Sequence, residues 1–146
     1  MRTVPGSRRV PHFAKAALER SLPRHGIEYM HMPELGGLRK PKADSINLGW
    51  RNVSFRGYAD YMQTDEFWAA VERLQDLARD RRLAIMCAEA VPWRCHRSLI
   101  ADALTVRGVE VRHITGKGEP AGHLLTSFAR VLGGRITYPA TDTLAL

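Results

Sequence analysis

The segment from Leu83 to Ile114 carries the pattern that most limits how this chain can fold. The apolar run 83–87 precedes a polar loop, and residues 97–107 then place apolar side chains three and four positions apart before Gly108. The first pattern suits a buried strand, the second suits an amphipathic helix that ends at glycine, and alternating residues 109–114 suit another strand. Strand, helix and strand in this order form a right-handed βαβ unit with parallel strands. The sequence therefore predicts an α/β fold, a three-layer sandwich with a mainly parallel sheet and a Rossmann-like outline.

The remaining segments give shorter signals. Residues 64–78 predict the clearest helix, because Thr64 is a good N-cap and the apolar residues of this segment share one helical face. These apolar residues are Phe67, Val71, Leu74 and Ala78. Elsewhere we expect short helices at 12–24 and 124–132, a strand at 27–31 and a long loop over the sheet at 38–56. The two glycines of the loop 32–37 can adopt backbone angles that other residues avoid.

The length and composition indicate a globular protein. A chain of 146 residues with 45% hydrophobic and 25% charged residues suits a single domain, here residues 1–146. No run of about 18 apolar residues is present, and the N-terminus lacks the apolar core of a secretory signal. We therefore expect a cytoplasmic protein whose two cysteines are reduced.

The net charge of +7 is concentrated at the front of the chain. Residues 1–42 contain nine Lys or Arg against three Glu, whereas the remainder contains thirteen against twelve acidic residues. A basic region of this kind attracts phosphate groups on nucleic acid or on a small ligand. A solvated basic surface without a partner has the same composition.

Both cysteines lie in the loop 87–97, which is expected to connect the first strand of the βαβ unit to its helix. The free N–H groups at a helix start favour an anion, and Arg94 and Arg97 would add bidentate contacts to it. The same positive surroundings would lower the pKa of Cys87 or Cys95. His96 offers an acid or base, and Glu89 offers a group to orient it or to accept a proton.

Several interpretations of this loop stay open. Cys87 is a candidate nucleophile with Arg94 as the anion clamp, although related thiol loops place arginine about six positions after cysteine rather than seven or ten. A metal is a second possibility, with Cys87, Glu89, Cys95 and His96 as ligands, but adjacent Cys-His ligands are awkward and C-x-x-C spacing is absent. A redox-inert structural loop is a third, and an anion or nucleic-acid site without a nucleophile is a fourth.

Two further groups are candidate ligand contacts. Arg2, Ser7, Arg8 and His12 would place a second basic group near the predicted helix start, or would solvate an exposed arm. Glu34, followed by Gly36 and Gly37, would reach a ligand over the sheet, although turn chemistry alone also explains the glycines.

Six short motifs occur in a fixed order along the chain. They are Pro11-His12-Phe13, Gly26-Ile-Glu-Tyr29, Pro33-Glu-Leu-Gly-Gly37, Gly57-Tyr-Ala-Asp-Tyr61, Met86-Cys-Ala-Glu89 and Cys95-His-Arg97. With these motifs the chain resembles the bacterial and archaeal family called domain of unknown function 488, over nearly its whole length. The resemblance implies signature positions at Arg2, Ser7, Arg8, His12, Phe13, Glu34, Gly36, Gly37, Cys87, Glu89, Cys95, His96 and Arg97. It supplies a pattern of residues and no reaction.

The chain departs from the family pattern at its front. Members usually begin with a strand, a helix and a second strand that ends in Asp-Val-Arg, and here Met1 stands where that valine is expected. About forty residues are then missing, including two strands, and an inner strand without its partner would expose an edge that invites aggregation. We expect a misplaced start codon or a fragment.

Taken together, these patterns predict a protein that binds a small ligand bearing phosphate or carboxylate. The catalytic candidates are Cys87, Glu89, Cys95 and His96, and the binding candidates are Arg2, Ser7, Arg8, His12, Glu34, Gly36, Gly37, Arg94 and Arg97. The alternatives are a nucleic-acid-binding protein and a thiol- or metal-dependent hydrolase or transferase. No cofactor is specified by the sequence, and no metal ligand is assigned.

Overall fold

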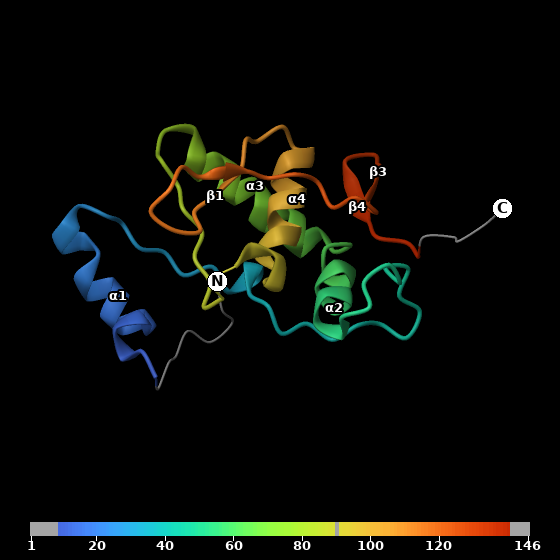
Figure 1. Cartoon of the computed structure of the whole chain (residues 1–146), viewed down its shortest axis with the longest axis horizontal. Helices are drawn as coiled ribbons and strands as arrows, with labels where there is room; N and C mark the ends of the chain where they lie inside the picture. Colours follow the sequence, from blue (N-terminus) through green and yellow to red (C-terminus); the bar gives the residue numbers. More distant parts are fainter. Residues whose placement is uncertain (1–8, 90, 141–146) are drawn as a thin grey trace.

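The computed structural model describes residues 9–89 and 91–140, and its regular structure is mainly helical (Figure 1). The α-helices in this part of the chain are α1 (Lys15–Ser21), α2 (Val53–Tyr61), α3 (Asp65–Arg79) and α4 (Arg97–Val106). Single 3-10 turns occur at Pro11–Phe13, Pro23–His25, Pro33–Leu35 and Pro92–Arg94. The strands are β1 (Arg112–His113), β2 (Ala121–Gly122), β3 (Arg130–Leu132) and β4 (Arg135–Thr137).

The predicted three-layer sandwich with a mainly parallel sheet is wrong. Within residues 9–89 and 91–140, the strands form two separate antiparallel pairs, β1 with β2 and β3 with β4. Residues 27–31 and 83–87, both expected to be strands, are extended without belonging to either pair. Of residues 109–114, only Arg112–His113 form a strand. An apolar pattern favours extended chain, but a strand also needs ladder pairing with a neighbouring strand, and these segments belong to neither strand pair of the described part.

The two segments that lack strand partners are also more exposed than a buried strand would be. Ile27 is 52% exposed, and Leu83 and Met86 are each 45% exposed. A strand covered on both faces would bury such side chains almost completely. The segment that leads to Cys87 is therefore an extended loop.

Helices α3 and α4 confirm their sequence patterns. The Thr64 hydroxyl oxygen accepts a hydrogen bond from the Phe67 N–H group at 3.3 Å, as expected of an N-cap. In α3 the side chains of Phe67, Val71 and Leu74 are buried, while Ala78 at the far end is exposed. In α4 the expected apolar residues are all buried, and Gly108 has a positive φ of 79° just after the helix. These residues are Leu99, Ile100, Ala103 and Leu104.

Helix α2 begins inside the region predicted to be a loop. The Asn52 side chain accepts hydrogen bonds from the N–H groups of Ser54 and Phe55 and so caps this helix. The preceding loop is attached to α2 through buried Asp60, whose carboxylate accepts bonds from the Ser45 hydroxyl and the Asn47 side chain at 2.7 and 2.8 Å. The loop prediction for 38–56 thus holds only up to the start of α2.

The helix expected at 124–132 is also wrong. Leu124 and Leu132 are both 87% exposed, and the end of this segment forms β3. Gly133 and Gly134 have φ values of 58° and 74° and connect β3 to β4. Two consecutive residues with positive φ form the tight turn that antiparallel hairpins favour. This turn, rather than apolar spacing, determines the local structure.

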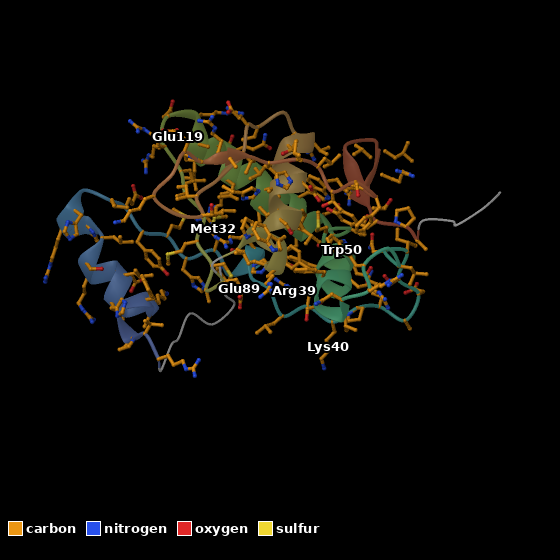
Figure 2. All side chains as sticks on the ribbon, viewed as in Figure 1. Met32, Arg39, Lys40, Trp50, Glu89 and Glu119 are labelled. Atoms are coloured by element: carbon orange, nitrogen blue, oxygen red, sulfur yellow. The ribbon has the colours of Figure 1, made fainter. Side chains whose placement is uncertain are left out.

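The core lies between α2, α3, α4 and the chain that follows β4. Trp50 lies beside α2 (Figure 2). Its ring packs on Phe55, Phe128 and Tyr138, with ring centroids 4.9–5.4 Å apart. Helix α1 stands apart from this body (Figure 1) and is shorter than the helix expected at 12–24. In the part of the chain that the structure describes, no helix combines the length and apolar character needed to cross a membrane.

Candidate functional site

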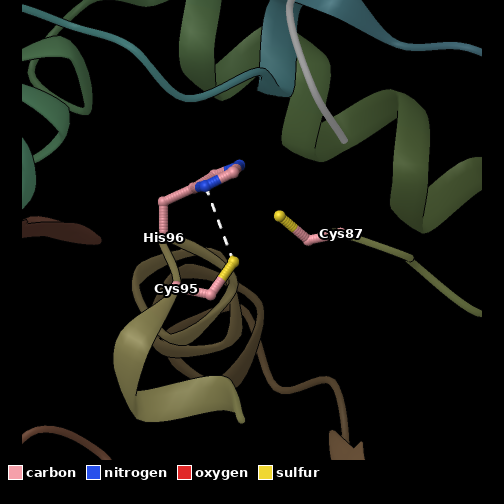
Figure 3. Close-up of side chains that lie close together, drawn as sticks. All are labelled: Cys87, Cys95 and His96. Carbon is pink, nitrogen blue, oxygen red and sulfur yellow. Dashed lines mark hydrogen bonds between the residues drawn. The ribbon is translucent and has the colours of Figure 1, made fainter. Parts of the chain in front are cut away.

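Cys87, Cys95 and His96 come together at the start of α4, and we call them the thiol cluster (Figure 3). One side-chain nitrogen or sulfur atom from each lies within 4.8 Å of the others. Cys87 ends the extended segment, whereas Cys95 and His96 follow the 3-10 turn at Pro92–Arg94. That turn closes with a 3.0 Å hydrogen bond from the Cys95 N–H group to the Pro92 carbonyl. The turn therefore brings the second cysteine back toward the first.

The Cys95 sulfur is held by the helix start. This residue is 3% exposed, and its sulfur lies 3.5 Å from the Arg97 nitrogen, whose N–H group donates to it. Its sulfur also lies 3.7 Å from His96 Nδ1. The first N–H groups of a helix have no partner inside the helix, so a sulfur acceptor here acts as a cap. The N–H groups of Ser98 and Leu99 donate to the carbonyls of Cys95 and His96.

The two cysteines differ sharply in acidity. The neighbouring Cys95 thiol, assisted by the Glu89 N–H group and the nearby His96, lowers the pKa of Cys87 to about 4 although partial burial opposes it. The same pairing with Cys87, together with burial, raises the pKa of Cys95 well above its usual range. A thiolate that accepts hydrogen bonds is favoured over the neutral thiol. At neutral pH the pair therefore holds one proton, which stays on Cys95.

The imidazole of His96 is enclosed by the protein. Its ring centroid lies 4.9 Å from that of Tyr58, and a Cβ atom at Gly37 would lie only 3.0 Å from Nδ1. Burial lowers the pKa of His96, which keeps the ring neutral at neutral pH. The Leu35 backbone acts in the opposite direction and raises the pKa of His96. Among the described residues, His96 Nε2 has no hydrogen-bond partner of ordinary geometry.

In the part of the chain that the structure describes, the thiol cluster is the group of Cys, His or carboxylate residues that is compact enough to hold one metal ion. Thiolate and imidazole are the ligands that zinc prefers, and a closed structural zinc site uses four of them. The cluster provides three ligands. The arrangement therefore combines a thiolate, a thiol and a neutral base around one point.

Comparison with known proteins places the chain in a family. The family model described as domain of unknown function DUF488 matches residues 1–104. The chain belongs to this family. The DUF488 match contains the entire thiol cluster and extends to Leu104 in α4. It confirms the resemblance inferred from the motifs over residues 1–104, rather than over nearly the whole chain. No curated protein and no solved structure matches the chain.

The other candidate residues, most of them DUF488 signature positions, lie at different places in the structure. Arg2, Ser7 and Arg8 lie outside the described residues. His12 is exposed and packs on Phe13, and the Glu89 and Arg94 side chains are also exposed. The Glu89 carbonyl accepts a hydrogen bond from the Arg97 guanidinium. The Glu89 backbone, rather than its carboxylate, therefore interacts with Arg97 and Cys87.

The Glu34 loop lies against the thiol cluster at Gly37. Gly36 has an ordinary extended backbone, and the positive φ of 63° belongs to Leu38, just after the loop. Neither Gly36 nor Gly37 therefore uses the positive φ that is open to glycine. Gly37 is needed because it lies against the His96 ring, where a larger side chain would collide. One carboxylate oxygen of Glu34 is buried without a hydrogen-bond partner among the described residues.

A second polar cluster, which was not predicted from the sequence, lies in the second half of α4 and the segments packed on it. Asp102, His113, His123 and Tyr138 form a chain of hydrogen bonds, which we call the aspartate network. His123 Nε2 lies 2.7 Å from one Asp102 oxygen, and the Tyr138 hydroxyl donates to the other at 2.8 Å. His113 Nε2 lies 2.8 Å from His123 Nδ1. The available signal was Asp102 itself, an acid among the apolar residues of a predicted helix.

Proposed function

We propose that this DUF488 protein is a thiol-dependent hydrolase or transferase in which the Cys87 thiolate attacks a small anionic ligand. The observation that carries the proposal is the position of the Cys95 thiol, a hydrogen-bond donor group whose sulfur lies within 4.8 Å of the Cys87 sulfur. It favours a thiolate at a position that is only partly buried, where a ligand has access. A cysteine with a purely structural role has no need of such a donor.

The three residues of the thiol cluster have distinct roles in this proposal. Cys87 forms a bond to the electrophilic atom of the ligand while the bond to the leaving group breaks. Cys95 holds the thiolate in place before the attack. Neutral His96 then accepts a proton from the water or acceptor molecule that releases the covalent intermediate, because a low pKa favours the base over the imidazolium.

Positive charge supports an anionic ligand. The chain carries a net charge of +7, and Arg94 is exposed in the turn immediately before Cys95. A nucleic acid is a weaker candidate, because most of the aromatic rings that could stack on bases are packed in the protein, although Trp93 and Phe13 are 67% and 51% exposed. Tyr58, Tyr61 and Trp68 are buried, and Trp50 and Phe55 pack against the core. A free thiolate also requires a reducing compartment, which favours the cytoplasm.

Alkylation by iodoacetamide across pH tests the thiolate. A thiolate with a pKa of about 4 stays ionised from pH 5 to 8, so the rate at Cys87 should be nearly constant over this range. The rate for free cysteine falls about tenfold per pH unit below pH 8, because its pKa is about 8.5. A low-pKa thiolate is also a weaker nucleophile, so Cys87 should react roughly tenfold to a hundredfold faster than cysteine at pH 5 and more slowly at pH 8.

Variants at the two cysteines supply the controls. Cys87→Ser should abolish rapid labelling, and Cys95→Ala should restore an ordinary pH profile because the thiol donor is lost. Cys95→Ser keeps a hydrogen-bond donor and should shift the profile less than Cys95→Ala. Circular dichroism checks that each variant is folded. A wild-type rate that falls tenfold per pH unit, or a stoichiometric zinc ion in the purified protein, would overturn the proposal.

A pair of matched reagents tests the preference for an anion. Iodoacetate and iodoacetamide deliver the same carbon to sulfur, but only iodoacetate carries a negative charge. The ratio of their rates at Cys87 should exceed the ratio for free cysteine and should fall with added salt, since salt screens the attraction. Arg94→Gln should lower the ratio and leave the iodoacetamide rate unchanged. A ratio that equals that of free cysteine would remove the anionic ligand from the proposal.

A further inference from the structure

The two cysteines of the thiol cluster are close enough to react with each other. Their sulfur atoms lie within 4.8 Å of each other, and Figure 3 shows the two side chains pointing toward one another. A disulfide needs a sulfur-to-sulfur distance of about 2 Å, so the two atoms must approach by less than roughly 3 Å. Both thiols are free in the structure.

Their surroundings show which cysteine would move. Cys95 is 3% exposed and is fixed by its bonds to the Pro92 carbonyl and the Arg97 N–H group. Cys87 is partly exposed and ends an extended segment that belongs to neither strand pair. An oxidant from solution therefore reacts with Cys87 first, because Cys95 is buried. Exposed and buried partners in this arrangement are typical of an attacking and a resolving thiol.

We infer that Cys87 and Cys95 close into a reversible disulfide when hydrogen peroxide reaches the site. In the first step the Cys87 thiolate attacks one peroxide oxygen, the O–O bond breaks, and protonation of the leaving hydroxide gives Cys87 sulfenic acid and water. In the second step the Cys95 sulfur attacks the Cys87 sulfur and displaces hydroxide, which takes the Cys95 proton and leaves as water. The two cysteines lose two electrons, and peroxide gains them.

The disulfide would switch off the proposed activity. It converts the Cys87 nucleophile into a neutral sulfur and removes the proton that Cys95 donates. A thiol reductant restores the Cys87 thiolate and the Cys95 thiol. This inference concerns the same site and rests on the proposed thiolate function for its biological meaning, while the disulfide itself depends only on the position of the two sulfurs.

Peroxide treatment of the full chain tests the inference. The protein is exposed to hydrogen peroxide at pH 7, denatured in N-ethylmaleimide and weighed intact by mass spectrometry. After peroxide, the wild type should remain a monomer and carry neither of its two maleimide adducts. Treatment with dithiothreitol before alkylation should restore both adducts. Cys95→Ser should stop at a sulfenic acid that dimedone traps at Cys87. Cys87→Ser should keep its Cys95 adduct, because the buried thiol is protected from the oxidant.

Two results would overturn the inference. One is oxidation of Cys87 to sulfinic acid while Cys95 still takes maleimide, and the other is a disulfide between two chains. The iodoacetamide profile is read separately. If the iodoacetamide rate is constant across pH but no disulfide forms, only this inference is refuted. If the rate follows the pH profile of an ordinary thiol but a disulfide still forms in a glutathione redox buffer, only the proposed function is refuted.

Discussion

Helix α4 carries two polar clusters of opposite character. The thiol cluster at its first turn is assembled from a loop and a helix start, and its Cys87 is partly exposed. The aspartate network lies in the second half of the helix, where Asp102 is fully buried. Two clusters in the same helix therefore differ in access to solvent, although both contain a histidine.

The clusters differ equally in how their polar atoms are satisfied. Asp102 accepts hydrogen bonds from the Tyr138 hydroxyl and the Thr126 N–H group and contacts His123, so both of its oxygens have partners. Burial and the adjacent Asp102 charge raise the pKa of Tyr138, which keeps its hydroxyl as a donor. In contrast, the thiol cluster shares one proton between two sulfurs and leaves His96 Nε2 without an ordinary partner among the described residues.

This difference distinguishes polar groups that stabilise the fold from polar groups that are able to react. A buried group with every hydrogen bond made contributes to stability and has nothing left to offer a ligand. A partly exposed group that is held in its charged form, with a neutral base nearby, is arranged for reaction. Under the proposed function, the thiol cluster reacts and the aspartate network stabilises the fold, and substitutions should separate the two properties.

The largest effect is expected from removal of Asp102. Asp102→Ala leaves His123, the Tyr138 hydroxyl and the Thr126 N–H group without their acceptor, and buried donors that lose a partner are costly. We expect a loss of about 3–5 kcal/mol in the free energy of unfolding, measured by urea denaturation. Asp102→Asn keeps the shape and one acceptor oxygen, and should lose less.

An exposed aspartate provides the control for this prediction. Asp76 forms a surface ion pair with Arg79 at 3.3 Å, so Asp76→Ala should change stability by less than about 1 kcal/mol. Folded Asp102→Asn should label at Cys87 at the wild-type rate. If labelling is lost while the fold is retained, the aspartate network takes part in the chemistry and the comparison between the clusters fails.

An intermediate effect is expected at Gly37. The Cβ of Gly37→Ala would lie 3.0 Å from His96 Nδ1 and 3.2 Å from Cε1, so the enclosed ring must shift. Overpacking of this kind costs about 1–3 kcal/mol. Because His96 helps to lower the pKa of Cys87, the midpoint of the labelling profile should also move upward. Thermal unfolding and iodoacetamide rates measure the two effects.

Another glycine supplies the matched control. Gly118→Ala adds the same methyl group where no atom lies within 4 Å, and should leave both measurements unchanged. Equal behaviour of the two variants would mean that residue 37 does not enclose the ring, and that the thiol cluster is open on that side.

The sequence was a good guide where local chemistry determines structure. Thr64 caps α3, and Gly108 ends α4, because both effects act within a few residues. The density of reactive side chains in the loop 87–97 also pointed to Cys87, Cys95 and His96, which the structure brings within 4.8 Å of one another. Pairing of strands is a long-range property, however, and the apolar run that ends at Cys87 did not reveal whether a partner strand exists.

The aspartate network shows why the remaining contacts were not predicted. Asp102 and Tyr138 are separated by 36 positions, and His123 enters from a segment that was expected to precede a helix. Spacing along the chain carries no information about such a meeting. An acid inside an apolar helical face does indicate that a buried partner exists, without identifying it.

The smallest effect is expected at the outer end of the aspartate network. His113→Ala removes one hydrogen bond, to His123, and leaves the bonds of Asp102 in place. The expected loss is about 0.5–1.5 kcal/mol in urea denaturation at pH 7.5.

The pH dependence of the same variant gives a sharper test. Burial, with the neighbouring His123 and Arg97, lowers the pKa of His113, so the unfolded chain binds more protons than the folded one below about pH 6.5. The contribution of neutral His113 is therefore present above that pH and is lost as the pH falls. The lowered pKa values of Cys87 and buried His96 act in the same direction, so the wild type should lose stability between pH 7 and 5, and His113→Ala should lose less of it. An unchanged slope would show that His113 binds its proton as readily in the folded protein as in the unfolded chain, and would place it outside the network.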